Sequence, residues 1–108
     1  MKNKEEKNKI LGKYVYPGRR IGWRIYGNTV LILLLPFRPN PETKVLKLRG
    51  SFRTYIWKLI KDRLQVREIV NLVARKKRVE PKVVEKGIIA FVKKLAAERI
   101  VDILDTPD

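Results

Sequence analysis

The spacing of apolar residues changes once along this chain, at Ser51, and that change restricts the possible folds more than any other feature. Before Ser51, over about residues 22–48, apolar residues alternate with polar ones or form one short continuous run, which is typical of β-strands. After Ser51 they recur every three or four positions, which is typical of amphipathic helices. The 108 residues suit a single domain. We therefore predict an α+β fold in which a sheet precedes a set of helices.

Three strands are predicted in the first part of the chain. In the segment WRIY, apolar Trp and Ile alternate with Arg and Tyr, and the Gly27-Asn28 pair that follows favours a two-residue hairpin turn. Val30–Leu35 is continuously apolar, which indicates a central strand or one covered on both faces. Residues 36–41 contain three prolines, which cannot donate to a ladder, and predict a loop. Thr43–Leu48 resumes the alternation, so we expect a three-stranded antiparallel sheet.

Three helices are predicted after the sheet, at about residues 51–61, 66–77 and 81–98. Ser51 is a suitable N-cap for the first helix, and Pro81 suits the first turn of the third. The expected buried stripe of the first helix is Phe52, Tyr55, Ile56, Leu59 and Ile60. The apolar residues between 100 and 104 indicate a short docking strand or a turn. The helices would pack on one another and on one sheet face, as a three-helix, winged-helix-like bundle.

The ends of the chain differ in composition from its middle. Residues 1–13 are rich in Lys, Asn and Glu and are expected to form a flexible basic tail. The Pro17-Gly18 pair indicates a turn. We predict one domain over residues 14–104, followed by an acidic tail at 105–108.

Charge and composition limit the function. The chain has 26 Lys and Arg against 11 Asp and Glu, a formal net charge of +15, and the excess lies within residues 1–80. Such a charge attracts a polyanion: nucleic acid, an acidic peptide or an acidic membrane face. The absence of Cys and His removes disulfides, thiolate nucleophiles, imidazole metal ligands and the usual general base. We therefore expect no enzyme activity, no metal and no cofactor.

The sequence also indicates where the protein is found. No apolar run approaches the roughly 20 residues that span a bilayer, and the basic N-terminus has no apolar stretch behind it that would make a secretory signal. A cytoplasmic protein without a membrane segment is therefore expected.

Several motifs follow one another in a characteristic order: the strand ends VLILLLP and KVLKLRG, the Ile56-Trp57 pair, and the helical segments VREIVNLV and IIAFVKKLAAERIV. Over residues 22–104 this order and spacing resembles the PqqD-like family, small domains that recognise precursor peptides in peptide-modification pathways. The sequence departs from the family pattern at three places. Leu48-Arg49 stands for a frequent Leu-Asn, Asp62-Arg63 for a frequent Asp-Gly, and Gly87 for an acidic residue that often lies four positions before the Phe of the last helix.

The resemblance implies that the domain does no chemistry and presents a leader peptide to a modifying enzyme, such as a radical S-adenosylmethionine enzyme. It implies that the peptide adds as an antiparallel strand to the open edge of the third strand, facing the last helix. The edge would consist of Lys44, Val45, Leu46, Lys47 and Leu48. The helix would contribute Lys82, Glu85, Lys86, Ile89 and Lys93. The lysines on both walls of the implied site would suit an acidic leader peptide. The edge lysines also suit solvated positions that deter aggregation, and an open edge would also allow a homodimer.

Nucleic-acid binding is the alternative function. Helices over about 62–78 and 81–98 would form a winged-helix type of reader, with phosphates bound by Arg75, Lys76, Lys77 and Arg78. No Arg, Asn or Gln lies between residues 82 and 98 to read base edges in a bidentate manner, and no wing follows the last helix. From this reading we expect at most nonspecific, salt-sensitive binding of nucleic acid.

Overall fold

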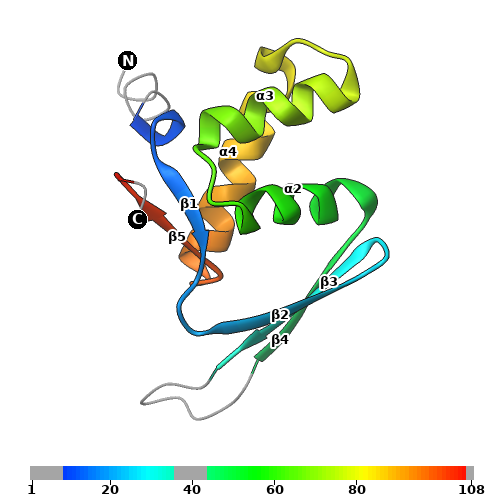
Figure 1. Ribbon diagram of the computed structural model, residues 1–108, viewed down its shortest axis with the longest axis vertical. Coiled ribbons are helices and arrows are strands. Elements are labelled where there is room, and N and C mark those ends of the chain that lie inside the picture. The colour runs from blue at the N-terminus through cyan, green and yellow to red at the C-terminus, as the bar shows by residue number, and fades with distance from the viewer. Residues whose placement is uncertain (1–8, 36–43, 107–108) are drawn as a thin grey trace.

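The computed structural model describes residues 9–35 and 44–106, and it confirms an α+β fold with the sheet before the helices (Figure 1). The strands are β1 (Tyr14–Pro17), β2 (Ile21–Tyr26), β3 (Thr29–Leu34), β4 (Lys44–Arg49) and β5 (Val101–Leu104). The helices are α2 (Ser51–Lys61), α3 (Val66–Lys77) and α4 (Pro81–Ala97). The predicted helix bounds agree to within a residue. The loop predicted over residues 36–41 lies outside the described residues.

The main sheet has three antiparallel strands in the order β2-β3-β4. Tyr26 pairs with Thr29 across the predicted Gly27-Asn28 turn, where Gly27 has a φ of 51°. The continuous apolar run places β3 in the centre, as predicted. Only one of its faces is buried: Ile32 is fully buried, whereas Leu33 on the other face is 36% exposed. The run therefore reflects a central strand and not one covered on both faces.

A second, two-stranded sheet of β1 and β5 joins the two ends of the chain, and we call it the terminal sheet (Figure 1). Tyr14 pairs with Leu104 and Pro17 with Val101. The sequence predicted only a turn around Pro17-Gly18, so β1 was missed, whereas the docking strand near the C-terminus is confirmed as β5. Val15 and Val101 are buried, which makes the terminal sheet part of the core.

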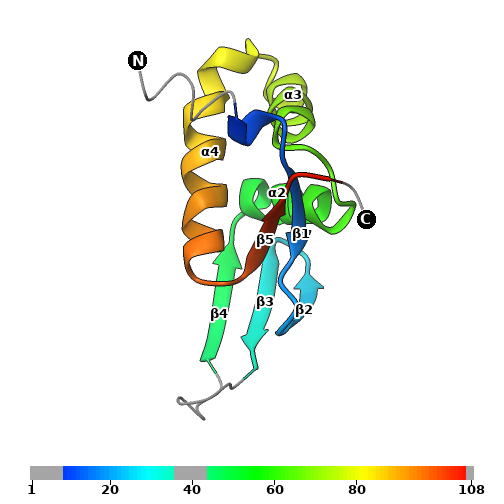
Figure 2. The same ribbon diagram turned by 90° about the vertical axis from the view of Figure 1, so that its left-hand side faces the viewer.

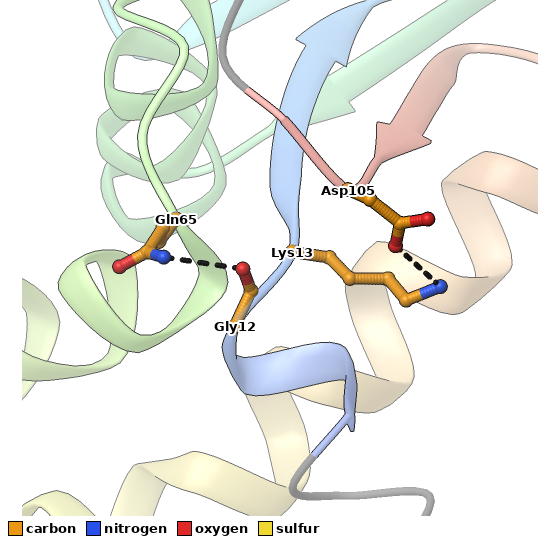
Figure 3. A network of polar contacts seen from close by, with 4 residues as sticks. All are labelled: Gly12, Lys13, Gln65 and Asp105. Carbon is orange, nitrogen blue, oxygen red and sulfur yellow. Dashed lines mark hydrogen bonds and ion pairs between the residues drawn. The ribbon is translucent and has the colours of Figure 1, made fainter.

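The residues just before β1 belong to the folded domain. Residues 9–11 are helical and Ile10 is 6% exposed within the core, so the ordered part begins inside the stretch predicted as a tail. Gln65 Nε2 donates to the Gly12 carbonyl oxygen at 3.1 Å, and Lys13 Nζ lies 3.1 Å from Asp105 Oδ1 (Figure 3). These contacts hold the N-terminal segment against α3 and the C-terminal segment. Residues 1–8 and 107–108 lie outside the described residues.

Helix α2 lies between the main sheet and α3 (Figures 1 and 2). Its N-cap is Gly50, with a φ of 115° that favours glycine, and not Ser51 as predicted. Its buried residues are Thr54, Ile56, Trp57, Leu59 and Ile60. Phe52 is 37% exposed, so the buried stripe is rotated relative to the predicted one. Trp57 is fully buried and meets the Trp23 ring edge-on, with the ring centroids 5.8 Å apart.

Helices α3 and α4 pack on each other, and each begins as the sequence predicts. Gln65 and Glu68 form a capping box at the start of α3. Pro81 opens α4 in the first turn. Val84, Ile88, Val92 and Leu95 form the buried stripe of α4, whereas Phe91 is only partly buried.

Candidate functional site: the open edge of β4 and its pocket

Strand β4 pairs with β3 on one side only, so its other edge carries backbone groups that no strand of the described chain uses. The Gly50 N–H donates to the Asn28 carbonyl oxygen at 2.8 Å, so Gly50 faces the β3 side. Strand residues alternate in direction, so the even-numbered residues of β4 also face β3. The N–H and C=O groups at the open edge are therefore those of Val45, Lys47 and Arg49.

The side chains along β4 divide between two faces. Val45, which is 57% exposed, and Lys47 point away from the core, next to Leu33 of the neighbouring strand. Leu46 and Leu48 point toward the core, where Leu46 is half-buried and Leu48 is 6% exposed. The edge therefore combines apolar surface with cationic side chains on its outer face.

A pocket of about 430 Å³ lies beneath the start of β4, and we call it the edge pocket. Its lining residues are Leu34, Lys44, Val45, Leu46, Ala97, Glu98, Arg99 and Ile100. Leu34 and Leu46 belong to the core-facing side of the sheet, so the pocket opens between that side and the end of α4. The wall is mostly apolar and is bordered by charged side chains of both signs.

The end of α4 forms one wall of the edge pocket because the chain reverses there. The helix ends at Ala97, and Arg99 adopts a left-handed conformation with a φ of 62°. The Ile100 N–H donates to the Leu95 carbonyl oxygen at 2.9 Å, which closes the last turn. Ile100 is 1% exposed, so its burial fixes the position of this wall.

The α4 residues that were predicted to contact the peptide lie nearer the N-terminus of the helix than the edge pocket does. Lys86 and Lys93 are exposed and share a helix face with Ala97, eleven and four residues away. At 1.5 Å per residue, Lys86 is about 16 Å from Ala97 along the axis. Figure 2 shows the N-terminal half of α4 rising away from the main sheet. The structure therefore joins the β4 edge to residues 97–100, which the sequence analysis did not single out, and leaves the more distant lysines beyond the edge pocket.

The other predicted helix residues differ in exposure. Lys82 is exposed, Glu85 is half-buried, and Ile89 is 5% exposed within the core. Ile89 therefore supports α4 from inside. The part that these residues play in binding stays a prediction. Apolar periodicity carries no signal for the turn 97–100, because which turn of a helix reaches a sheet edge depends on the tertiary packing.

The residues of the nucleic-acid alternative lie at the end of α3, which Figure 1 shows far from β4. They are Arg75, Lys76, Lys77 and Arg78, all of them exposed. Lys76 Nζ lies 4.5 Å from the centre of the Tyr55 ring, and Lys77 Nζ lies 3.9 Å from that of Phe52. Both cations therefore rest on aromatic faces of α2.

The described residues provide neither a metal site nor a membrane-spanning helix. Within residues 9–35 and 44–106, no group of three or more acidic, His or Cys side chains is placed to hold a metal ion. In the same ranges, no helix combines the length and apolar character that a membrane span needs.

Fold and site together define a small α+β domain with an open sheet edge beside a preformed pocket, a geometry suited to an extended peptide. Residues 40–101, more than half of the chain, match the family described as "Coenzyme PQQ synthesis protein D (PqqD)". The chain belongs to this family, which confirms the resemblance noted in its sequence. The match covers β4 and helices α2 to α4, and it includes every lining residue of the edge pocket except Leu34.

A solved structure has the same fold. It is described as "TbiB1 in Complex with the TbiA(beta) Leader Peptide" and matches with a TM-score of 0.69 at 18% identity, over 86% of this chain and 99% of that chain. No curated protein matches the sequence. Neither the family nor this structure points to nucleic acid.

Proposed function

We propose that this protein is a peptide-recognition domain that binds the leader of a precursor peptide as a fourth strand on β4. The domain itself does no chemistry and presents the precursor to a modifying enzyme in the cytoplasm, for example a radical S-adenosylmethionine enzyme. One observation carries the proposal: the outward-facing backbone groups of Val45, Lys47 and Arg49 form an open strand edge, and the start of that strand, Lys44–Leu46, lines the edge pocket. Membership of the PqqD family and the leader peptide in the TbiB1 structure support it.

Backbone pairing would supply most of the affinity. Each outward-facing residue offers one donor and one acceptor, as in any antiparallel ladder. Six residues of β4 span about 20 Å, so a peptide segment of similar length would pair along the whole edge. Pairing of this kind is independent of peptide sequence, so selectivity has to come from side chains.

The side chains of the added strand would alternate between two environments. Those on the core-facing side would enter the edge pocket, whose wall of Leu34, Leu46 and Ile100 suits an apolar residue. Those on the outer side would lie near Lys47 and Arg49, which suits acidic residues.

The same charges disfavour a homodimer through this edge. Two copies of β4 paired antiparallel would gather Lys44, Lys47 and Arg49 of both copies on one strand pair, with Lys47 opposite Lys47 when the pairing is centred there. Like charges directly opposite each other destabilise a strand pair. An acidic leader peptide is therefore the better occupant of the edge.

The experiment is a titration of backbone amide shifts with leader peptides encoded in the same genome. We expect the shifts to concentrate on residues 44–49 and 97–100. Lys47→Pro removes an outward-facing donor, and Lys47→Ala is the matched control that keeps it. Loss of one backbone hydrogen bond with a desolvated partner costs about 1–3 kcal/mol, so Lys47→Pro should weaken binding roughly 5- to 150-fold and Lys47→Ala much less.

Two results would contradict the proposal. One is a set of shifts confined to Arg75–Arg78 with residues 44–49 unaffected. The other is equal affinity for the Lys47→Pro and Lys47→Ala variants when both retain the folded spectrum. An edge proline is tolerated because its missing N–H faces solvent, whereas Leu46→Pro would remove a donor to β3 and should unfold the domain.

A further inference from the structure

Two further cavities follow the edge pocket along the surface, and the added strand proposed above occupies neither of them. A cavity of about 490 Å³ shares Leu34 and Arg99 with the edge pocket. A third, of about 420 Å³, shares Arg19 and Asp102 with the second. Because each cavity shares lining residues with the next, the three lie in a row, and we treat them as one groove. Its lining residues come from the start of β4, the α4–β5 turn and the corner between β1 and β2, and Figure 2 shows how these elements are arranged.

The far part of this groove is strongly cationic, and we call it the arginine groove. Its charged residues are Arg19, Arg20, Lys61, Arg63, Arg99 and Asp102. Five of these six side chains are positive, and they come from three separate parts of the chain. Within the described residues, neither Arg19 nor Lys61 has a carboxylate at ion-pair distance. The groove therefore concentrates positive charge, and at Arg19 and Lys61 no carboxylate of the described residues neutralises it.

Aromatic rings line the same groove. The Arg63 guanidinium lies 5.5 Å from the centre of the Tyr16 ring, which holds this cation in place. Arg63 also adopts a left-handed conformation with a φ of 60°, which is uncommon for a residue other than glycine. Trp23, 36% exposed, forms a further part of the wall. The site thus combines fixed charge with apolar surface.

The direction of strand addition determines which part of a bound peptide reaches this groove. A peptide antiparallel to β4 has its N-terminal end near Arg49 and its C-terminal end near Lys44. Lys44 and Arg99 both line the edge pocket, and Arg99 also lines the neighbouring cavity. We propose that the leader segment C-terminal to the added strand carries acidic side chains and lies in the arginine groove. This inference rests on the proposed function.

A second copy of this chain is a poor candidate for the groove, because each copy has a net charge of +15. An acidic segment of the same peptide gains from being tethered, since its effective concentration is high once the strand has paired. The groove would therefore act as a second recognition site. It would bind acidic residues that lie between the added strand and the modified part of the precursor.

The experiment selects binders to the protein from a displayed library of random 15-residue peptides, so no natural ligand has to be known. Selected peptides are then titrated against three proteins. These are the wild type, the Arg19→Ser/Lys61→Ser variant and the Arg53→Ser/Lys58→Ser control, which loses the same charge from exposed positions of α2 outside the groove. All four substituted side chains are exposed, so both variants should fold.

We expect selected peptides to shift the amides of residues 44–49 and to carry Asp or Glu after the strand-forming segment. The groove variant should lose about 3- to 10-fold in affinity relative to the control, and the difference should shrink at high salt. If peptides bind the β4 edge but the two variants bind equally, or if the acidic residues precede the strand segment, the inference is wrong while the proposed function stands. If no selected peptide shifts residues 44–49, the proposed function fails and the inference fails with it.

Discussion

Replacing Gly18 with alanine should destabilise the protein, because this position leaves no room for a side chain. A Cβ at Gly18 would lie 2.6 Å from the Arg99 carbonyl oxygen and 3.0 Å from that of Ile100. Both are backbone atoms, which cannot move aside by a change of rotamer. The Gly18 N–H also donates to the Ile100 carbonyl oxygen at 2.8 Å. The residue therefore joins the end of β1 to the turn between α4 and β5 at close approach.

The magnitude follows from three contributions. Forcing an extra methyl group into packed structure costs about 1–3 kcal/mol. Weakening the hydrogen bond to Ile100 adds about 0.5–1.5 kcal/mol. The lower entropy of the unfolded alanine chain offsets about 0.4–1 kcal/mol. We therefore expect Gly18→Ala to lower the free energy of unfolding by about 1–4 kcal/mol. Each kcal/mol lost should lower Tm by roughly 4–8 °C.

Thermal and urea unfolding, followed by circular dichroism, measure this effect. Gly12→Ala is the matched control, since it lies just before the same strand and its Cβ would find only an ordinary contact, 3.8 Å from the Lys9 carbonyl oxygen. The control should be neutral or slightly stabilising. Equal Tm values for the two variants would refute the argument that the terminal sheet and the α4–β5 turn are in close contact at Gly18.

The remaining predictions concern the core and the helices. Trp57→Ala should lower the free energy of unfolding by about 3–5 kcal/mol in urea titrations, because Trp57 is fully buried against Trp23. Trp57→Phe should cost much less, since it keeps a ring there and removes an indole N–H that has no acceptor among the described residues. Gly87→Ala should raise stability by about 1 kcal/mol, because the position is helical and a Cβ there meets open space; an unchanged or lower Tm would contradict this. In a double-mutant cycle, the Lys13–Asp105 pair should couple by less than about 1 kcal/mol, less at high salt, because Asp105 is well exposed.

The main sheet and the helix bounds could be predicted because their signals are local. The Gly27-Asn28 turn, the change of period at Ser51 and Pro81 each act within a few residues of where they stand. Strand β1 had no such signal. Its four residues are too few to show a period, and its partner β5 lies at the opposite end of the sequence. Pairing over that separation is decided by packing of the whole domain.

The rotation of the buried stripe on α2 has a related cause. Periodicity alone allowed a stripe that begins at Phe52, and the choice between it and the observed face depends on what α2 contacts. Helix α2 contacts β3 on one side and α3 on another, which requires Trp57 inside and leaves Phe52 at the rim under Lys77. Thr54 is also buried on the observed face. Because it is polar, the spacing of apolar residues could not indicate that it is buried.

The edge residues of the candidate site could be predicted because the strand order made β4 an edge. The wall of the edge pocket formed by residues 97–100 could not be predicted. That wall depends on the terminal sheet. The Gly18 N–H holds the Ile100 carbonyl oxygen, and Val101 continues directly into the β1–β5 ladder. Both Ile100 and Val101 are buried, so the end of α4 is fixed relative to the main sheet before any peptide arrives. A groove with walls on rigid elements lowers the ordering cost of binding, which then falls mainly on the peptide. The missed strand β1 is therefore part of what shapes the proposed peptide site, although it contributes nothing to the β4 edge itself.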